Sequence, residues 1–143
     1  MSKPASDRDA NAAVALALFS LPMLAIVAGV TDLAGAYRQR AALQDALDDA
    51  MAAAGQVAGM DADRQRVAEG LFYPRVAELG VRGASIATGP VGESGMLAGD
   101  ARALYPTRML SVVSLKSIII NVHSEVKAAG GGRRRVEAVK GGP

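Results

Sequence analysis

The chain contains no cysteine and no tryptophan, and aromatic residues make up only 3% of its 143 residues. Without cysteine there is no disulfide, no thiolate metal site and no cysteine nucleophile, although this absence does not exclude a location outside the cytoplasm. Half of the residues are hydrophobic all the same, and they are mainly alanine and small aliphatic residues. Such a composition favours long helices with closely packed surfaces over a bulky aromatic core.

Residue types that carry catalysis are also scarce. His123 is the only histidine, and its place among alternating polar residues predicts a surface side chain rather than a metal ligand or a general base. Asp45, Asp48 and Asp49 share one helix face that a hard cation could meet, but a solvated acidic face is the more typical interpretation. No glycine-rich segment follows a clear strand and opens a helix, as a phosphate-binding loop requires. The sequence therefore predicts no enzyme activity, no metal, no cofactor and no small-molecule substrate.

The formal net charge of +2 is concentrated near the C-terminal end. Three consecutive arginines, Arg133–Arg135, lie there between glycine-rich residues. This composition predicts a flexible, solvated tail over residues 129–143 rather than a nucleic-acid-binding surface. Contact of the arginines with phosphate or anionic lipid is the alternative.

The strongest physical signal is an uncharged apolar run from Ala12 to Val30. At about 1.5 Å of rise per residue a helix of this length spans roughly 28 Å, close to the hydrocarbon thickness of a bilayer. Ser20 is its only clearly polar residue, and membrane helices tolerate a proline such as Pro22. The run predicts a transmembrane helix over residues 12–31, after a short N-terminal stub at residues 1–11.

Two features of this predicted span leave alternatives open. Ala34-Gly35-Ala36 offers the small-residue pattern of a secretory cleavage site, although the apolar run is longer than a removable leader usually has. Basic residues lie on both sides of the run, so charge alone does not set its orientation. A short stub followed by a whole domain outside the cytoplasm is the simpler topology.

Small residues recur at four-residue spacing along the predicted span. Ala13 pairs with Ala17, and Ala25 pairs with Gly29. This spacing allows a second helix to approach closely, which makes these four positions candidates for helix packing in the membrane. An alanine-rich helix also produces such pairs by chance.

Helical periodicity continues beyond the span. Residues 32–59 contain no proline, and apolar residues recur on one face while charged residues occupy much of the rest. One helix is therefore predicted from residue 12 to about residue 59, with an amphipathic extension over residues 32–60.

A second helix is predicted over residues 62–79. Its apolar residues suggest that Val67, Leu71, Val76 and Leu79 face inward, with Arg64 among the residues facing outward. Pro74 predicts a break near Phe72-Tyr73, because proline removes a backbone donor and clashes with the preceding turn.

The rest of the chain predicts strands at residues 81–88, within 96–105 and at 117–128, with a short helical turn within 106–115. The last strand is the clearest, because Ile118, Ile120, Val122, Ser124 and Val126 alternate with polar residues. The predicted fold class is α+β, with a small antiparallel sheet of about three strands packed on the helices. Residues 61–128 are predicted to form the extracytoplasmic domain.

Several segments of this pattern resemble a known family. Residues 12–22, 32–38 and 43–48 are similar to the start of TadG-like and TadE-like proteins of the Tad (Flp) pilus-assembly system. The family positions matched there are Pro22, Asp32, Tyr37, Leu43 and Gln44. Pro106 and Thr107, followed by the last strand, are similar to a second family segment. The resemblance is best over residues 10–59 and fair over 105–128.

The resemblance implies a single-pass protein of the bacterial inner membrane, with its C-terminal domain in the periplasm or outside the cell. Its expected partners are the lipid bilayer and other pilus or secretion components, or copies of itself. Asp9-Ala10-Asn11 lacks the Gly-Glu-type cleavage site of prepilins, so processing by a prepilin peptidase is not expected. The predicted function is that of a membrane-anchored, non-enzymatic component that acts through helix packing and head-domain contacts.

Two other functions are alternatives. One is an anchored ligand-binding or sensing domain, which would need a concave pocket with convergent polar groups. The other is a pilin-like filament subunit.

Overall fold

The computed structural model describes residues 7–130, which form two helices, three strands and one 3₁₀ turn. The predicted stub lies partly outside these residues, and the predicted basic tail lies almost entirely outside them. The elements follow in the order α1 (Asp7–Gln56), α2 (Asp61–Ala77), β1 (Arg82–Thr88), β2 (Met96–Pro106), η1 (Leu110–Val113) and β3 (Ser117–Lys127). The predicted α+β class is confirmed.

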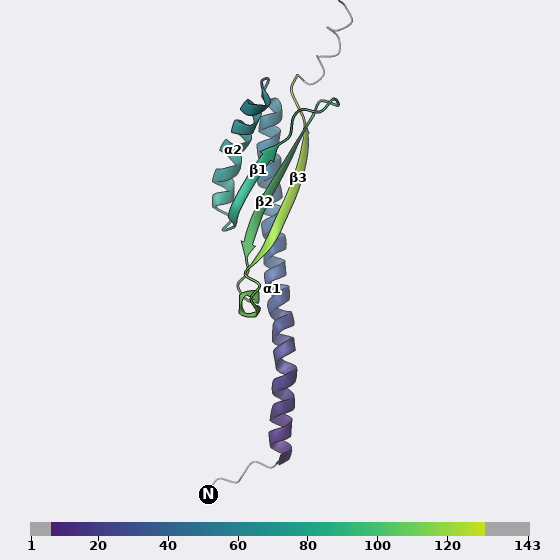
Figure 1. The fold of residues 1–143 in the computed structure, drawn as a ribbon, viewed down its shortest axis with the longest axis vertical. Helices are drawn as coiled ribbons and strands as arrows, with labels where there is room; N and C mark the ends of the chain where they lie inside the picture. The colour runs from purple at the N-terminus through teal and green to yellow at the C-terminus, as the bar shows by residue number, and fades with distance from the viewer. Residues whose placement is uncertain (1–6, 131–143) are drawn as a thin grey trace, which may run out of the picture.

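Helix α1 is a single helix of 50 residues, about 75 Å long. Pro22 lies inside it without ending it. The first half of α1 projects away from the rest of the molecule as a bare shaft (Figure 1). Its large apolar side chains, Phe19 and Leu24 among them, are exposed along this shaft. By length and composition α1 is the one helix within residues 7–130 that could cross a membrane, and none of its most apolar stretch is buried.

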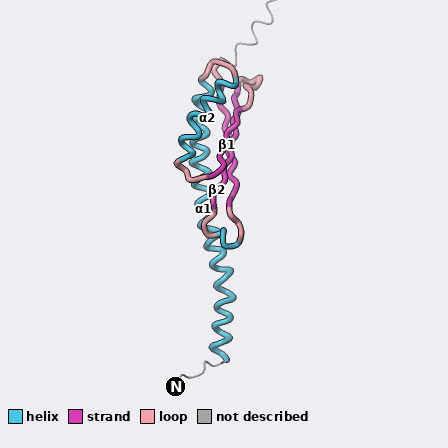
Figure 2. The backbone as a smooth tube through the Cα atoms, turned by 60° about the vertical axis from the view of Figure 1, so that its left-hand side comes forward, coloured by secondary structure: helices cyan, strands magenta, loops and turns pink. Residues whose placement is uncertain are grey.

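The second half of α1 forms the centre of a compact head. Leu43, Leu47, Ala50, Met51 and Ala54 have no exposed surface, and their three- and four-residue spacing places them on one face of the helix. This face packs on β3 and β2, while α2 packs beside α1 and against β1. Figure 2 shows the head edge-on, with both helices on one side of the sheet. The head therefore has two layers, one of helices and one of strands.

The sheet is antiparallel, with the strand order β1-β2-β3. Side chains along β3 alternate between the buried inner face and the exposed outer face, as in a half-buried strand. Ile120, Val122 and Ser124 are buried, whereas Asn121 and His123 are exposed. The outer face is exposed within residues 7–130 and carries polar side chains such as Asp100, Arg102 and Glu125, with Ile119 exposed among them. The alternation expected for the last strand is confirmed.

The predicted inward face of α2 is right at Val76, which is buried, and at Leu79, which packs against the core, but it is wrong at Leu71 and Arg64. Leu71 is 47% exposed, whereas Phe72 has no exposed surface and the expected outward residue Arg64 is buried. Ala68 and Val76 complete the buried row at four-residue spacing. Phe72 rather than Leu71 belongs to the buried core, and its larger ring buries more apolar area than leucine would.

The expected break at Pro74 is also wrong, because α2 continues through this residue to Ala77. Proline deprives the carbonyl four residues earlier of its partner, and that residue is Gly70. Gly70 is exposed, and no atom lies within 4 Å of the position that a Cβ would take there. Water can therefore reach the carbonyl that lacks its helical bond.

Gly99 and Gly70 provide a matched pair of substitutions that tests this packing. A Cβ at Gly99 would overlap the buried side chain of Met51, whereas one at Gly70 would meet open space. We expect Gly99→Ala to lower the free energy of unfolding by about 1–3 kcal/mol, because Met51 must leave its position in a packed core. Gly70→Ala should raise it by about 0.5–1 kcal/mol through helix propensity. Denaturant unfolding of the full chain in detergent micelles measures both, and equal effects would contradict the head packing.

Candidate interaction site

Asp32 lies on α1 where the exposed shaft meets the head, and it is only 2% exposed. Its carboxylate accepts three backbone N–H bonds, from Arg108 at 3.0 Å, Met109 at 2.9 Å and Leu110 at 2.7 Å. The bond from Leu110, assisted by the other two, holds the pKa of Asp32 below its usual value against the opposing effect of burial. The three donors precede and begin η1, so the carboxylate satisfies N–H groups that have no partner within the turn.

The segment that supplies these donors is the β2–β3 loop, residues 107–116. It is closed at its base by the Thr107 N–H, which donates to the Lys116 carbonyl at 3.2 Å, and by the Thr107 hydroxyl, which donates to the Leu115 carbonyl. The Leu115 N–H donates to the Leu110 carbonyl at 3.1 Å. These bonds make the loop a compact unit that meets α1 as a whole.

Gly35 allows Tyr105 to lie close to α1, while Gly29 lies at ordinary contact distance from the loop. A Cβ at Gly35 would overlap the Tyr105 hydroxyl, and one at Gly29 would lie 3.9 Å from the Leu110 methyl group. Gly29 and Gly35 lie one turn before and one turn after Asp32. The contact therefore extends along two turns of α1, with a charged hydrogen-bond acceptor at its centre.

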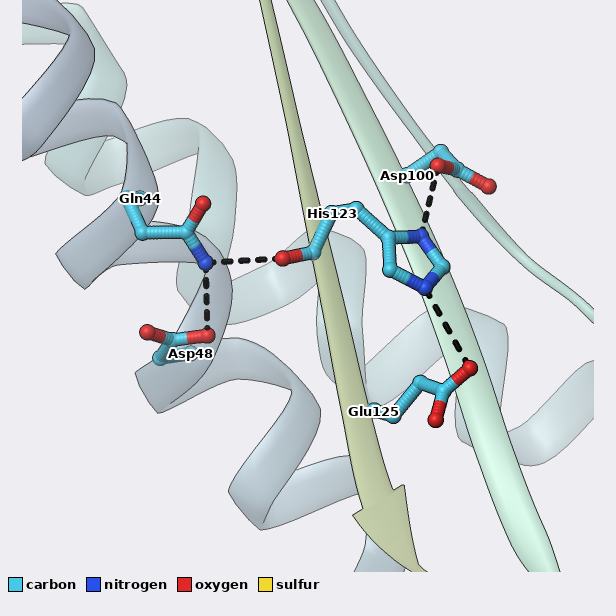
Figure 3. A network of polar contacts seen from close by, with 5 residues as sticks. All are labelled: Gln44, Asp48, Asp100, His123 and Glu125. Atoms are coloured by element: carbon cyan, nitrogen blue, oxygen red, sulfur yellow. Dashed lines mark hydrogen bonds and ion pairs between the residues drawn. The ribbon is translucent and has the colours of Figure 1, made fainter.

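Gln44 forms a second contact between α1 and the sheet (Figure 3). Its amide nitrogen donates to the His123 carbonyl of β3 at 2.9 Å and to the Asp48 carboxylate at 2.9 Å. Strand β3 lies at the edge of the sheet, so Gln44 occupies a carbonyl at an edge where a foreign strand could otherwise pair.

The His123 ring points away from Gln44, onto the open face of the sheet (Figure 3). Its Nδ1 lies 2.8 Å from the Asp100 carboxylate, and its Nε2 lies 3.4 Å from that of Glu125. The bond to Asp100, followed by that to Glu125, raises the pKa of His123 above its ordinary value. The exposed position of the ring agrees with the prediction of a surface residue. Within residues 7–130 no group of three His, Asp or Glu side chains is placed to hold a metal ion.

The other residues singled out from the sequence are spread along α1 and β2. Leu43 is in the core, Tyr37 is exposed, and Pro106 is half-buried at the end of β2. Ala13, Ala17 and Ala25 are exposed on the shaft together with Pro22, whereas Gly29 is half-buried near Leu110. The structure thus joins the segment of Pro106 and Thr107 to Asp32. The sequence did not predict that Gly35 makes room for Tyr105. The only indication of this contact in the sequence is a small residue one turn after Asp32.

An open hollow lies at the end of the head farthest from the shaft. It is lined by the α1–α2 connection, the turn before β2 and the residues after β3. Arg64 lies in its wall, where it pairs with Asp61 at 3.0 Å and donates to the Ala129 carbonyl at 3.4 Å. These bonds hold the first turn of α2 to the chain that follows β3, so the arginine serves the packing of the head.

The structure defines the protein as an exposed apolar helix that continues into a small two-layer α+β head. A family model of the Flp pilus-assembly TadE/G-like proteins (Tad) matches residues 10–66. This range includes the shaft, the core half of α1 and the start of α2, and it confirms the resemblance seen in the N-terminal part of the sequence. The second segment of resemblance, residues 105–128, lies outside the matched range. Searches of curated proteins and of solved structures find no significant match.

Asp32→Asn tests the contact between α1 and the β2–β3 loop. An amide retains one acceptor oxygen and turns an NH₂ group toward the donors, so we expect faster amide hydrogen exchange at Met109 and Leu110, on the order of tenfold. Asp45→Asn, an exposed aspartate on the same helix, is the control and should leave this exchange unchanged. The pKa of Asp32 is lower in the folded than in the unfolded protein. The stability that ionised Asp32 contributes to the fold is therefore complete above its unfolded pKa of about 3.8 and is lost as the pH falls through the folded pKa. Unchanged exchange in Asp32→Asn would refute the contact.

The single histidine gives an isolated probe of the open face. We expect an NMR titration of His123 to report a pKa above 6.5, and Asp100→Asn to lower it toward 6.5. Because the folded pKa is raised, the stability from the His123–Asp100 pair is complete below about 6.5 and is lost as the pH rises through the folded pKa. Glu93→Gln, an exposed carboxylate in the turn before β2, is the control. A His123 pKa that does not respond to Asp100→Asn would contradict the geometry.

Proposed function

We propose that the protein is a non-enzymatic, single-pass component of a Tad (Flp) pilus or secretion apparatus in the bacterial inner membrane. In this proposal residues 12–31 span the bilayer and the head lies in the periplasm or outside the cell. The TadE/G-like match over residues 10–66 carries the proposal, because it joins the apolar shaft to the core helix of the head in one family segment.

The continuity of α1 supports a mechanical role. The helix that leaves the apolar shaft supplies Leu43, Leu47 and Met51 to the head core, and no loop interrupts it. A partner that binds the shaft therefore holds the head at a fixed height above the membrane. The Asp32 contact stiffens the point at which the two parts meet.

Two surfaces are available to partners. Ala13 and Ala17 lie on an exposed part of the shaft where another membrane helix could approach closely. At the Ala25 and Gly29 pair, Leu110 of the same chain already lies near Gly29, which favours the first pair as the helix-packing site. The open face of the sheet offers its polar side chains to other apparatus components or to copies of the protein.

A second candidate function is that of a pilin-like filament subunit. The shaft-and-head shape favours it, because apolar shafts can pack side by side in a filament while the heads cover its surface (Figure 1).

Fractionation of cells with carbonate extraction and intact-mass analysis tests the proposal. We expect the uncleaved chain in the inner membrane, resistant to carbonate. A mature form found in sheared filaments would support the filament subunit instead, and a soluble chain that begins near Tyr37 would refute the anchor.

Leu21→Arg gives the same experiment a matched variant. Leu21 is exposed near the middle of the shaft, and an arginine at the centre of a membrane helix costs about 2.5–3.5 kcal/mol. We therefore expect a large loss of Leu21→Arg from the carbonate-resistant fraction. Ala41→Arg places the same charge on an exposed part of α1 beyond the span and should leave the fraction unchanged. Equal behaviour of the two variants would argue against residues 12–31 as the span.

A further inference from the structure

The β2–β3 loop exposes apolar side chains although it lies at the surface of the head. Val112 is 87% exposed, Met109 is 54% exposed and Leu115 is 48% exposed. Packing does not explain this exposure, because the loop meets α1 through Leu110 and its backbone, while these three side chains face away from the core. Three exposed apolar side chains grouped on one short loop indicate a contact outside the chain.

The position of the loop identifies the kind of contact. Its backbone is bonded to Asp32, the first residue after the predicted span, and Leu110 lies near Gly29, inside the apolar run. The loop also protrudes from the end of the head that faces the shaft (Figure 1). When residues 12–31 span the bilayer, the loop therefore lies at the depth where hydrocarbon gives way to headgroups.

The charges of the loop fit the same environment. Exposed Arg108 and Lys116 flank the apolar residues, and no acidic residue lies between them. Long basic side chains reach from such a depth to lipid phosphates while their stems stay in the apolar layer. The negative charge of Asp32 does not disfavour contact with lipid phosphates, because its carboxylate is enclosed by the three N–H bonds of the loop.

We propose that the β2–β3 loop is a second membrane contact, which inserts Met109, Val112 and Leu115 into the headgroup–acyl boundary of the leaflet nearest the head. This inference rests on the proposed membrane span. A head held by α1 alone could turn about the helix axis and tilt. A second insertion point beside the helix fixes both motions, so the open face of the sheet is presented to partners in one direction relative to the bilayer.

The absence of tryptophan makes each introduced tryptophan a unique fluorescent probe. The full chain is reconstituted in phosphatidylethanolamine–phosphatidylglycerol vesicles with bromine placed either near the headgroup or near the end of the acyl chain. V112W reports on the loop, L21W on the middle of the span, and L71W on an equally apolar but distant exposed position of α2. We expect a blue-shifted V112W that is quenched most by the shallow bromine, an L21W quenched most by the deep bromine, and an L71W quenched by neither.

The outcomes separate the loop from the anchor. If L21W is quenched and V112W is not, loop insertion is refuted while the membrane span stands. If neither is quenched, the span fails and the inference fails with it. If V112W is shielded from water but insensitive to both bromines, and its shielding grows with the protein-to-lipid ratio, a second copy covers the loop, and the lipid contact is refuted.

Discussion

The remaining elements of the structure pack against α1. The whole arrangement therefore depends on this helix being continuous, although its first half is exposed and its second half is buried in the head. Its first half exposes apolar side chains that only another apolar medium would cover, and its second half buries Leu43, Leu47 and Met51 in the head. Neither half could be replaced by a loop without separating the head from the shaft. Pro22 is exposed on the shaft, so a local bend there would leave the core unaffected.

Asp32 satisfies backbone donors at the point where the exposed shaft meets the head. The turn of η1 has N–H groups without partners inside the turn, and these must be satisfied from outside it. The carboxylate of α1 accepts three of these groups at once. The acid is thereby kept ionised and shielded, and the loop gains a fixed position on the helix. The same contact holds the loop that carries Met109, Val112 and Leu115 beside the end of the shaft, which is the basis of the proposed membrane contact.

Much of this arrangement was predictable from local patterns. An uncharged run ending at Asp32 indicated the shaft, strict alternation indicated β3, and the segments around Pro22 and Gln44 resembled the family that matches residues 10–66. Which of the neighbouring apolar residues Leu71 and Phe72 faces inward was not predictable, because only the packing of α2 in the core decides it. The effect of Pro74 depended in the same way on whether water reaches Gly70.

The sequence by itself determined which segments are apolar on all sides, which are amphipathic and which alternate, because these properties follow from the order of side chains along a helix or strand. It therefore determined the long helix, the sheet and their class. Only the tertiary structure decided the partner of Asp32, since the donors follow 76 to 78 residues later in the chain. It alone decided that Gln44 meets the edge of β3 and that the apolar loop lies beside the shaft. Such pairings depend on how separate elements pack together, which no local pattern encodes.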